Sequence, residues 1–322
     1  MKIELTAKDK LILKELAQDS RQPLAAIAKK TMLSKQVVDY RIRNMIKSGL
    51  IKKFITVVNW KALGYMSFRL YLQLEKISEE ELRAMIEELK TFDGVYFVGL
   101  CEGKVNVVIR FLVRSVDEFK VMLEKTIGRF GKYIWDKQIT LVTEDPLAFT
   151  SPGAYIWGDT ETTVSKNKKK GDINVDETDL EIVRELTENS RKSAIEIAKE
   201  IGRSPDNTSY RIKRMVKSGA ILGFRCFIDS TELGFEHRKI FLRMNYFDSK
   251  KKQSFFDYYS THPNVVFLLG CIGNWDVELD FDVKDTKHFH ELVMDMKNKF
   301  GDIIKNYDTT VFLEEYYLTS FD

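Results

Sequence analysis

The first fifty residues carry apolar positions at a helical period, interrupted by short polar breaks. The spacing predicts three short helices: residues 7–18, a second helix that opens at Pro23 or Leu24, and a third that runs to Ser48. Ser34 stands where the third helix needs an N-cap, and Gly49 is a C-cap signal. The apolar positions of these helices are Leu11, Ile12, Leu16, Ile27, Ala28, Val38, Ile42 and Met45.

The pattern changes after Gly49. The segment LIKKFITVVN, residues 50–59, alternates between apolar and polar positions and predicts a β-ribbon. Three short helices, a glycine and a ribbon hairpin describe a winged helix-turn-helix, in which the third helix enters the major groove of DNA.

Residues 63–144 show strand and helix patterns in the order β-α-β-β-α-β, which is that of a ferredoxin-like domain. Both helices of such a domain lie on one side of its sheet, so the other face is bare and usually packs on a partner. The expected elements are a strand at 63–75, a helix at 78–92, a hairpin at 95–113, a helix at 115–131 and a strand at 133–144.

The whole pattern occurs twice, and the two occurrences align without a gap. Ser20-Arg21 aligns with Ser190-Arg191, and Cys101 aligns far downstream with Cys271, so the shift between the copies is constant. The constant shift between the copies is too long for the repeat of a solenoid and fits two duplicated halves. With two such sheets in one chain, we expect them to face each other or to pair with those of a second chain.

The sequence therefore predicts an α+β chain that contains two copies of a winged helix-turn-helix followed by a ferredoxin-like βαββαβ sensor domain. Within the linker between the copies, Tyr155, Ile156 and Trp157 are too apolar to stay in water and are expected to dock on a sensor domain. The expected boundaries are 1–60 for the first head, 61–149 for the first sensor domain, 150–173 for the linker, 174–230 for the second head and 231–322 for the second sensor domain.

Charge separates the modules, although the net charge of the 322 residues is only +3. Residues 1–56 carry 13 Lys/Arg against 5 Asp/Glu, whereas residues 227–322 carry 11 against 17. The second head is neutral, but its residues 201–226 hold six Lys/Arg against one Asp. This distribution indicates that only part of the chain faces a polyanion.

The outward residues of each third helix are candidates for DNA contacts, because Gln and Asn suit adenine, and Arg and Lys suit guanine and phosphate. Arg41 and Arg211 lie one position from the inward face, so they either contact DNA or tie the helix to its own module. The DNA-contact candidates are Lys35, Gln36, Tyr40, Arg43 and Lys47 in the first copy, and Arg203, Asn207, Tyr210, Lys213, Arg214 and Lys217 in the second.

The strand Trp275–Val283 places four carboxylates on one face, while the apolar residues between them cover the helices. These carboxylates either pair with Lys239 and Arg243 of the neighbouring strand or face the first copy, with Arg110 close to Asp280 or Asp282. The second arrangement would favour association of the first copy with the second over self-association. The carboxylates are Asp276, Glu278, Asp280 and Asp282.

Several motifs, in this order, resemble the Lrp/AsnC (feast/famine) family of transcription regulators. They are D-x-x-I-L-x-x-L at Asp9–Leu16, D-S-R from Asp19, LSKQVVDYRIRNMIKSGLI at 33–51 and Leu63-Gly64. The resemblance covers both copies and implies operator binding through the winged heads and dimerisation through the sensor sheets. Relatives normally carry one copy per chain, so the tandem form departs from their usual symmetric assembly.

The resemblance also implies a small effector, often an amino acid, near the loop between the second and third sensor strands. That loop has the pattern Gly-x-x-Asp, present here as Gly273, Asn274, Trp275 and Asp276. The first copy has Asn106 in place of the aspartate, which weakens any grip on an ammonium group, so the second copy is the better candidate. Alternatively, the loop glycines only permit a tight turn.

Little in the sequence indicates catalysis or metal binding. His288 and His290 are two apart on a predicted helix and point to different faces, and no nucleophile–base spacing or phosphate loop is present. We expect no enzyme activity, no cofactor and no metal. The start MKIELTAKDK lacks a signal-peptide core and no apolar run could span a bilayer, so we expect a cytoplasmic protein without membrane contact.

Together these features predict a sequence-specific regulator whose partners are double-stranded DNA and a small-molecule effector at the sensor-sheet interface, acting as a homodimer or an intramolecular pseudo-dimer. Two alternatives remain. Siroheme decarboxylases are similar to this family, but the acidic sheet of the second copy fits a tetrapyrrole with many carboxylates poorly. An interaction module with weakened DNA binding is the other alternative, indicated by the neutral second head.

Overall fold

The computed structural model describes residues 3–144, 154–158, 173–245 and 249–318. The three predicted helices of the first head are confirmed as α1 (Ala7–Gln18), α2 (Leu24–Thr31) and α3 (Lys35–Lys47), with Ser34 capping α3 by accepting a hydrogen bond from Val37 N–H. The second head repeats them as α7 (Glu177–Glu188), α8 (Ala194–Glu200) and α9 (Pro205–Ser218).

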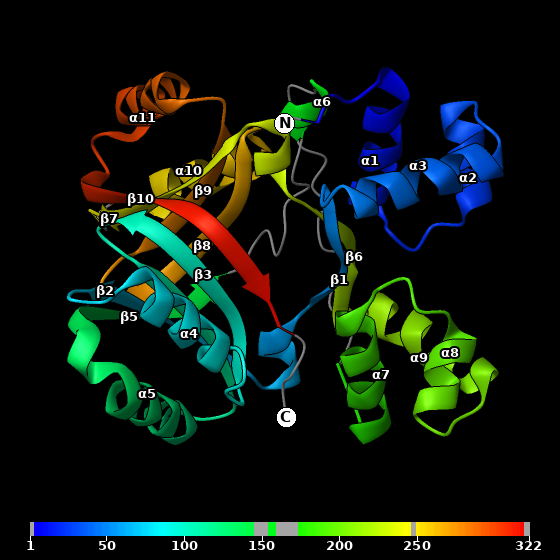
Figure 1. The fold of residues 1–322 in the computed structure, drawn as a ribbon, viewed down its shortest axis with the longest axis horizontal. Coiled ribbons are helices and arrows are strands. Elements are labelled where there is room, and N and C mark those ends of the chain that lie inside the picture. The colour runs from blue at the N-terminus through cyan, green and yellow to red at the C-terminus, as the bar shows by residue number, and fades with distance from the viewer. Residues whose placement is uncertain (1–2, 145–153, 159–172, 246–248, 319–322) are drawn as a thin grey trace.

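The wing differs from the predicted hairpin. Each copy contributes a single strand, β1 (Ile51–Val58) or β6 (Ile221–Ile228), and these two strands pair antiparallel with each other. The prediction of a ribbon hairpin inside each head was wrong because each copy supplies its ribbon residues in one strand, without a turn to bring a second strand back. The ribbon therefore belongs to both copies and joins them (Figure 1).

Each head completes its hydrophobic core with residues of the other copy. Helix α1 packs on β6, so Cys226 and Ile228 are buried in one cluster with Ile12. Helix α7 packs in turn on β1, and Thr56 Oγ1 of β1 donates to the carbonyl of Leu186 at 2.6 Å. Neither head can bury its apolar face without the partner copy, so the two heads are interlocked.

The sensor domains have the predicted βαββαβ order. The first contains β2 (Met66–Leu74), α4 (Glu79–Leu89), β3 (Val95–Gly103), β4 (Val107–Val113), α5 (Val116–Phe130) and β5 (Ile134–Glu144). The second contains β7 (Glu236–Met244), α10 (Ser249–Thr261), β8 (Val265–Gly273), β9 (Val277–Val283), α11 (Thr286–Phe300) and β10 (Ile304–Tyr317). Short 3-10 turns, Trp60–Leu63 and Ser230–Leu233, lead from the ribbon into them, and a third, Gly131–Tyr133, precedes β5.

The two sheets close into one barrel in the order β10-β3-β4-β2-β5-β8-β9-β7. The last strand of each sheet pairs with the edge strand of the other, so Thr140 lies opposite Gly273 and, in the symmetry-related seam, Thr310 lies opposite Gly103. The helices lie outside the barrel, as Figure 1 shows for α4, α5 and α11. The expectation that the two sheets face each other is met within one chain, and closure leaves neither sheet with an open edge.

Most of the predicted linker lies outside the described residues. The part that is described forms the short helix α6 (Ala154–Trp157). Ile156 is buried in the core of the first head, while the ring of Tyr155 packs against Phe235 and His288. The apolar segment thus docks on the first head as well as on the second sensor domain, where only sensor docking was expected. No helix in the described part of the chain has the length and apolarity that a membrane span requires.

Candidate nucleic-acid interface and sensor interior

The third helices of both heads present their predicted faces to solvent. Tyr40 and its counterpart Tyr210 are each 65% exposed, although both are large aromatic side chains. The two heads lie on the same side of the ribbon, away from the barrel (Figure 1). The other exposed candidates are Lys35, Gln36, Arg43 and Lys47 on α3, and Arg203, Asn207, Lys213 and Lys217 at or on α9.

The inner arginines of these helices are structural anchors. Arg41 donates to Asp9 Oδ1 at 2.7 Å, and Arg211 donates to Asp176 at 2.8 Å and to Asp179 at 3.0 Å. The acceptors Asp9 and Asp179 also belong to the capping boxes that begin α1 and α7. Each recognition helix is therefore tied to the start of its own head, which decides between the two roles left open for Arg41 and Arg211.

Arg214 differs from the other candidates in the second head. Its guanidinium pairs with Asp179, whose side chain is fully buried, and its own side chain is 40% exposed. The first copy has Asn44 at the equivalent position. Arg214 thus strengthens the anchor of α9, and its charge is already engaged within the head.

The two heads meet at a symmetric contact that we call the head seam, formed by Ser20, Arg21, Ser190 and Arg191. The hydroxyl oxygens of Ser20 and Ser190 lie 2.7 Å apart and are buried. Arg191 donates to the carbonyl of Ser20 at 2.5 Å, and Arg21 donates to the carbonyls of Ser190 and Lys192. Each guanidinium also lies over a phenylalanine of the other copy's ribbon strand, Phe224 or Phe54.

The Ser-Arg pair of the head seam occurs at the same position in both copies, but nothing in the sequence indicated its role. The signal that could have identified the head seam is the recurrence of an arginine and a serine just outside a predicted amphipathic helix. In the structure, both serines are fully buried because they lie between the copies.

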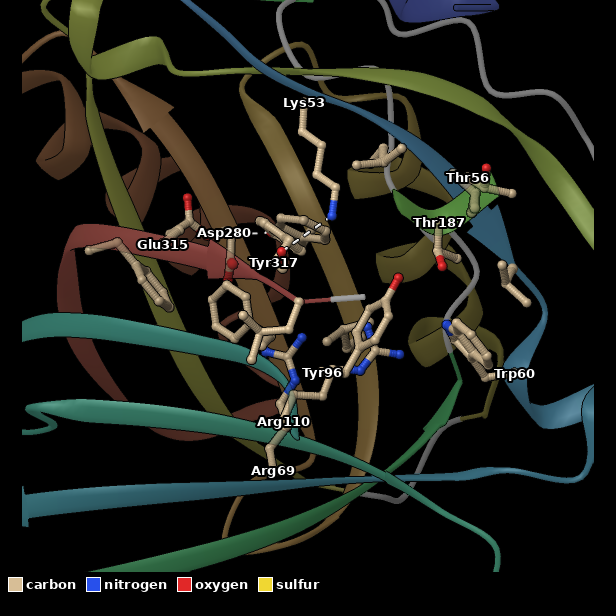
Figure 2. Close-up of a pocket in the computed structure, with 18 residues that line it drawn as sticks. Lys53, Thr56, Trp60, Arg69, Tyr96, Arg110, Thr187, Asp280, Glu315 and Tyr317 are labelled. Carbon is tan, nitrogen blue, oxygen red and sulfur yellow. Dashed lines mark hydrogen bonds between the residues drawn. The ribbon is translucent and has the colours of Figure 1, made fainter. Parts of the chain in front are cut away.

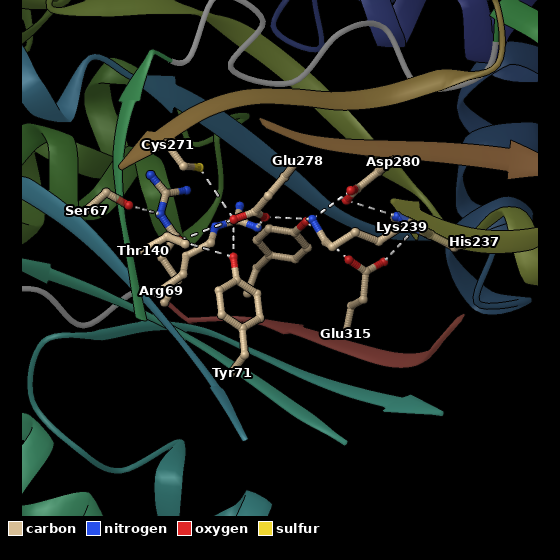
Figure 3. Close-up of polar contacts among 12 residues, drawn as sticks. Ser67, Arg69, Tyr71, Thr140, His237, Lys239, Cys271, Glu278, Asp280 and Glu315 are labelled. Carbon is tan, nitrogen blue, oxygen red and sulfur yellow. Dashed lines mark hydrogen bonds and ion pairs between the residues drawn. The ribbon is translucent and has the colours of Figure 1, made fainter. Parts of the chain in front are cut away.

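The barrel interior holds a chain of buried charges that we call the sensor network: Arg69, Tyr71, His237, Lys239, Glu278, Asp280 and Glu315 (Figure 3). Glu278 is its centre. Arg69 from the first copy donates to Glu278 at 2.7 Å, and Lys239 from the second copy donates to the same oxygen at 3.0 Å. The hydroxyl of Tyr71 donates to the other carboxylate oxygen. A fully buried carboxylate thus joins the two sensor domains.

The network continues through the second copy. Lys239 Nζ lies 2.6 Å from Asp280 Oδ1, and the ring of His237 lies between Asp280 and Glu315, with each N···O distance 3.3 Å. Burial opposes a charge on His237, but the two carboxylates raise the pKa of the imidazole well above its usual value. Burial likewise opposes ionisation of Glu278, and Arg69 and Lys239 outweigh it and lower the pKa of that carboxyl.

The predicted pairing of Arg110 with Asp280 or Asp282 is replaced by a different one. Within the sensor network, the ion pair between the copies is Arg69–Glu278, while Arg110 Nε donates to Ser67 at 2.9 Å and its guanidinium lies over the ring of Tyr96. The alternative of neighbouring-strand pairing is met by Lys239. Arg243 instead donates to the carbonyl of Asn274. Asp282 accepts from Ser230 at 2.9 Å, and burial raises its pKa to about 6.

The candidate effector loop performs structural tasks. Gly273 has φ of +140°, and a Cβ there would lie 2.3 Å from the carbonyl oxygen of Ile139 on the adjoining strand. Trp275 is buried and stacks on Phe241. Asp276 accepts from Met244 N–H at 2.7 Å, and Asn106 of the first copy accepts from Leu74 N–H at the same distance.

The exchange of Asp for Asn between the copies therefore preserves one backbone hydrogen bond. Asn274 and Asp276 also border a shallow polar hollow, to which Arg243 and Lys305 contribute.

A deeper pocket lies between the ribbon and the barrel (Figure 2). It encloses, together with its mouth, about 790 Å³ of space not filled by protein atoms. Lys53 reaches into it from β1, and Arg69 and Arg110 reach into it from barrel strands, as Figure 2 shows. The sequence did not predict this pocket, because its walls come from strand β1 of the ribbon, from the second head and from both sensor domains. In the described residues, no three His, Cys, Asp or Glu side chains gather as a metal site would require.

Comparison with known proteins supports the functional interpretation of the heads. A family model for winged helix-turn-helix DNA binding matches residues 5–52 and 175–221, once in each copy. The transcriptional regulator FL11 of Pyrococcus furiosus is 30% identical over 116 residues, which are 36% of this chain and 76% of that protein. The regulator AzlB of Bacillus subtilis is 28% identical over 121 residues, 37% of this chain and 77% of that protein.

The chain belongs to the Lrp/AsnC family of transcription regulators. Each relative aligns over about three quarters of its own length with little more than a third of this chain, and the head model matches twice, so this member carries the family's unit twice. Membership makes the chain a DNA-binding transcription regulator, as the sequence predicted, and the relatives FL11 and AzlB are named as regulators and not as enzymes.

A solved structure of similar architecture over the whole chain is the siroheme decarboxylase NirDL. It covers 98% of this chain and 95% of its own, with a TM-score of 0.63 and 12% identity. At that identity the likeness shows a shared fold alone: a tandem of two such units around one barrel.

Proposed function

We propose that this Lrp/AsnC-type regulator contacts DNA with both heads at once and acts in the cytoplasm. The head seam carries the proposal, because it holds two exposed basic helices on one side of the ribbon in a fixed relation. Helix-turn-helix dimers use such an arrangement to place two recognition helices in major grooves on one face of the duplex. Here the two helices differ in sequence, so the preferred site is expected to be asymmetric.

The proposed contacts follow from exposure and chemistry. Tyr40 and Tyr210 stand in the middle of each exposed face, and the neutral second head presents its basic half, α9. We exclude Arg214 from the direct contacts because Asp179 engages it. The proposed contact residues are Lys35, Gln36, Tyr40, Arg43 and Lys47 with Arg203, Asn207, Tyr210, Lys213 and Lys217.

Fluorescence polarisation with genomic and random DNA fragments, at low and moderate salt, tests this function. We expect salt-sensitive binding, with an affinity that falls steeply as salt rises because several phosphates are neutralised. Binding that ignores salt, or its absence under every condition, would contradict the proposal and favour an interaction module.

We also propose that a small-molecule effector binds the sensor pair and changes DNA affinity. The hollow at Gly273–Asp276 is the place that the family resemblance indicates, and Asn274 and Asp276 border it. The double variant Asn274→Ala/Asp276→Ala, compared with Lys104→Ala at the equivalent loop of the first copy, tests this loop by the DNA affinity measured with and without amino acids. An effect confined to the second copy supports it.

A further inference from the structure

The pocket beneath the ribbon touches every part of the molecule that would have to move during regulation. Its walls include Lys53 and Val58 of the ribbon, Thr187 at the end of α7 in the second head, Tyr96 of the first sensor domain and Phe267 of the second. A ligand there would contact a head, the ribbon and both sensor domains at once. A ligand shifts an equilibrium only through differential contacts, and this pocket supplies them.

The pocket has a cationic side and an aromatic side. Arg69 is 8% exposed; one terminal nitrogen of its guanidinium binds Glu278, but its buried Nε has no hydrogen-bond partner. Lys53 lies opposite on the ribbon, where burial lowers the pKa of its ammonium group, and a nearby anion would offset that burial.

The carboxylates of the pocket wall are already engaged. Asp280 binds Lys239 and His237, and Glu315 lies against His237. Among the described residues that line the pocket, these two are the acids, so a ligand ammonium group would have to compete with the sensor network. A ligand anion would meet the ammonium group of Lys53 and the guanidinium groups of Arg69 and Arg110, which line the pocket.

The apolar body of a ligand would lie on the aromatic side. Trp60 and Tyr96 are in edge-to-face contact, with ring centroids 5.3 Å apart, and Phe97 and Tyr317 contact each other nearby at 4.9 Å. Apolar and aromatic walls with a few placed polar groups are typical of small-molecule sites.

The equivalent place in the other copy differs from this pocket in its residues and carries more acidic side chains. When the two copies are aligned, Lys53, Trp60 and Tyr96 correspond to Gly223, Ser230 and Val266. Ser230 and Val266 do line a second, smaller pocket, together with Asp282 and His237. This second pocket also has a ribbon cation, Lys52, but Lys52 pairs with Asp229 at 2.6 Å within the pocket wall.

We propose that the pocket between the ribbon and the barrel binds a small monocarboxylate with an aromatic or branched apolar body, and that it is a second regulatory site, separate from the hollow at Gly273–Asp276. This inference rests on the proposed function. Its carboxylate would accept hydrogen bonds from Lys53 and Arg69, and its apolar body would lie against Trp60 and Tyr96. Binding would change the position of the ribbon relative to the barrel, and hence the position of the two heads relative to DNA.

Isothermal titration calorimetry on the full chain tests the pocket without DNA. The probes are phenylacetate, indole-3-acetate and 4-methylvalerate, with phenethylamine and inorganic phosphate as comparisons. We expect at least one carboxylate to bind and the amine and phosphate to bind at least about tenfold more weakly. No binding by any of the three carboxylates, or equal binding by the amine, overturns the inference.

The variant Lys53→Met should weaken carboxylate binding at least about tenfold, whereas Lys52→Met, on the neighbouring position that pairs with Asp229, should leave it unchanged. Arg110→Gln provides a second variant and Arg110→Lys its charge-preserving control. Equal affinities of wild type, Lys53→Met and Arg110→Gln for the carboxylate contradict the proposed site.

Polarisation titrations of DNA, with and without the bound carboxylate, then test regulation. We expect an affinity change of about fivefold or more in wild type and none in Lys53→Met. If the free protein does not bind DNA, the proposed function fails while calorimetry still decides the pocket. If DNA binds normally and the bound carboxylate leaves its affinity unchanged, the pocket is not a regulatory site.

Discussion

The two contacts between the copies differ in symmetry. In the head seam, both copies contribute equivalent residues: Ser20 meets Ser190, and Arg21 and Arg191 each donate to the other copy's backbone, Arg21 to two carbonyls and Arg191 to one. In the sensor network, the first copy gives Arg69 and Tyr71, and the second gives the carboxylate Glu278 that they bind. The duplicated chain has kept two-fold symmetry near DNA and lost it inside the barrel.

This difference explains why the two copies pair with each other. Position 278 of the second copy is Val108 in the first, and position 280 is Arg110. Pairing two first copies would bury Arg69 twice without the carboxylate that now compensates it. Pairing two second copies would gather two sets of Glu278, Asp280 and Asp282. Buried charges without partners are costly, so the barrel selects the mixed pair.

The largest test removes the centre of the sensor network. Glu278→Ala leaves Arg69 and Lys239 buried without their shared carboxylate, and we expect it to lower the free energy of unfolding by about 3–5 kcal/mol. Urea denaturation monitored by circular dichroism measures this, with Val108→Ala at the equivalent position of the first copy as the control for lost volume. A smaller loss for Glu278→Ala than for Val108→Ala would show that the network does not hold the copies together.

The second test uses pH and Asp282. Its folded-state pKa of about 6 lies above the ordinary value of 3.8, so the folded protein binds the proton more tightly than the unfolded chain. The stability that this group contributes is therefore present below about pH 4 and is lost as pH rises to about 6, an effect on the order of 3 kcal/mol.

The variant Asp282→Asn should remove this loss of stability with rising pH. The difference in unfolding free energy between wild type and variant, measured from pH 4 to pH 7, isolates Asp282 from Glu278 and Asp280, whose lowered pKa values act in the opposite direction at lower pH. A constant difference across the range would contradict the assignment.

The third test asks whether the head seam is symmetric in energy as well as in geometry. Arg21→Ala removes two hydrogen bonds from a charged donor to backbone carbonyls and Arg191→Ala removes one, and we expect each variant to cost about 1.5–3 kcal/mol of stability. Urea denaturation of both single variants and the double variant gives the coupling between them. Clearly unequal single effects would mean that the two heads are not held equivalently.

The smallest effect concerns DNA. Lys47→Ala and Lys217→Ala replace equivalent exposed lysines in the two heads, and each should reduce the slope of log affinity against log salt by about one. Polarisation titrations over a salt series measure the slopes, with Lys132→Ala on the first sensor domain as the matched control. If only one of the two lysines changes the slope, one head does not contact phosphate.

The sequence predicted the parts of this molecule that depend on local pattern. Apolar spacing and the cap at Ser34 located α1, α2 and α3 closely, and the βαββαβ order of each sensor domain is confirmed. The acidic strand was correctly expected to turn its carboxylates away from the helices, since Glu278 and Asp280 are buried inside the barrel.

What the sequence missed depends on contacts between the copies. The wing needs a strand from the other copy, and the ribbon pocket has walls from four modules. The predicted pairing between the copies was Arg110 with Asp280 or Asp282, whereas the structure pairs Arg69 with Glu278. Periodicity within a segment carries no information about which distant segment completes it. The repeat showed that two sheets exist, but only their strand register decides which side chains meet.

Because both halves of the closed barrel belong to one covalent chain, mass action does not govern their encounter. A regulator assembled from separate subunits comes apart on dilution, and its occupancy of an operator then falls faster than in proportion to its concentration. Here the second half is always present at the effective concentration set by the connecting segment. A cell that holds only a few copies of this chain would therefore still have every one of them ready to bind.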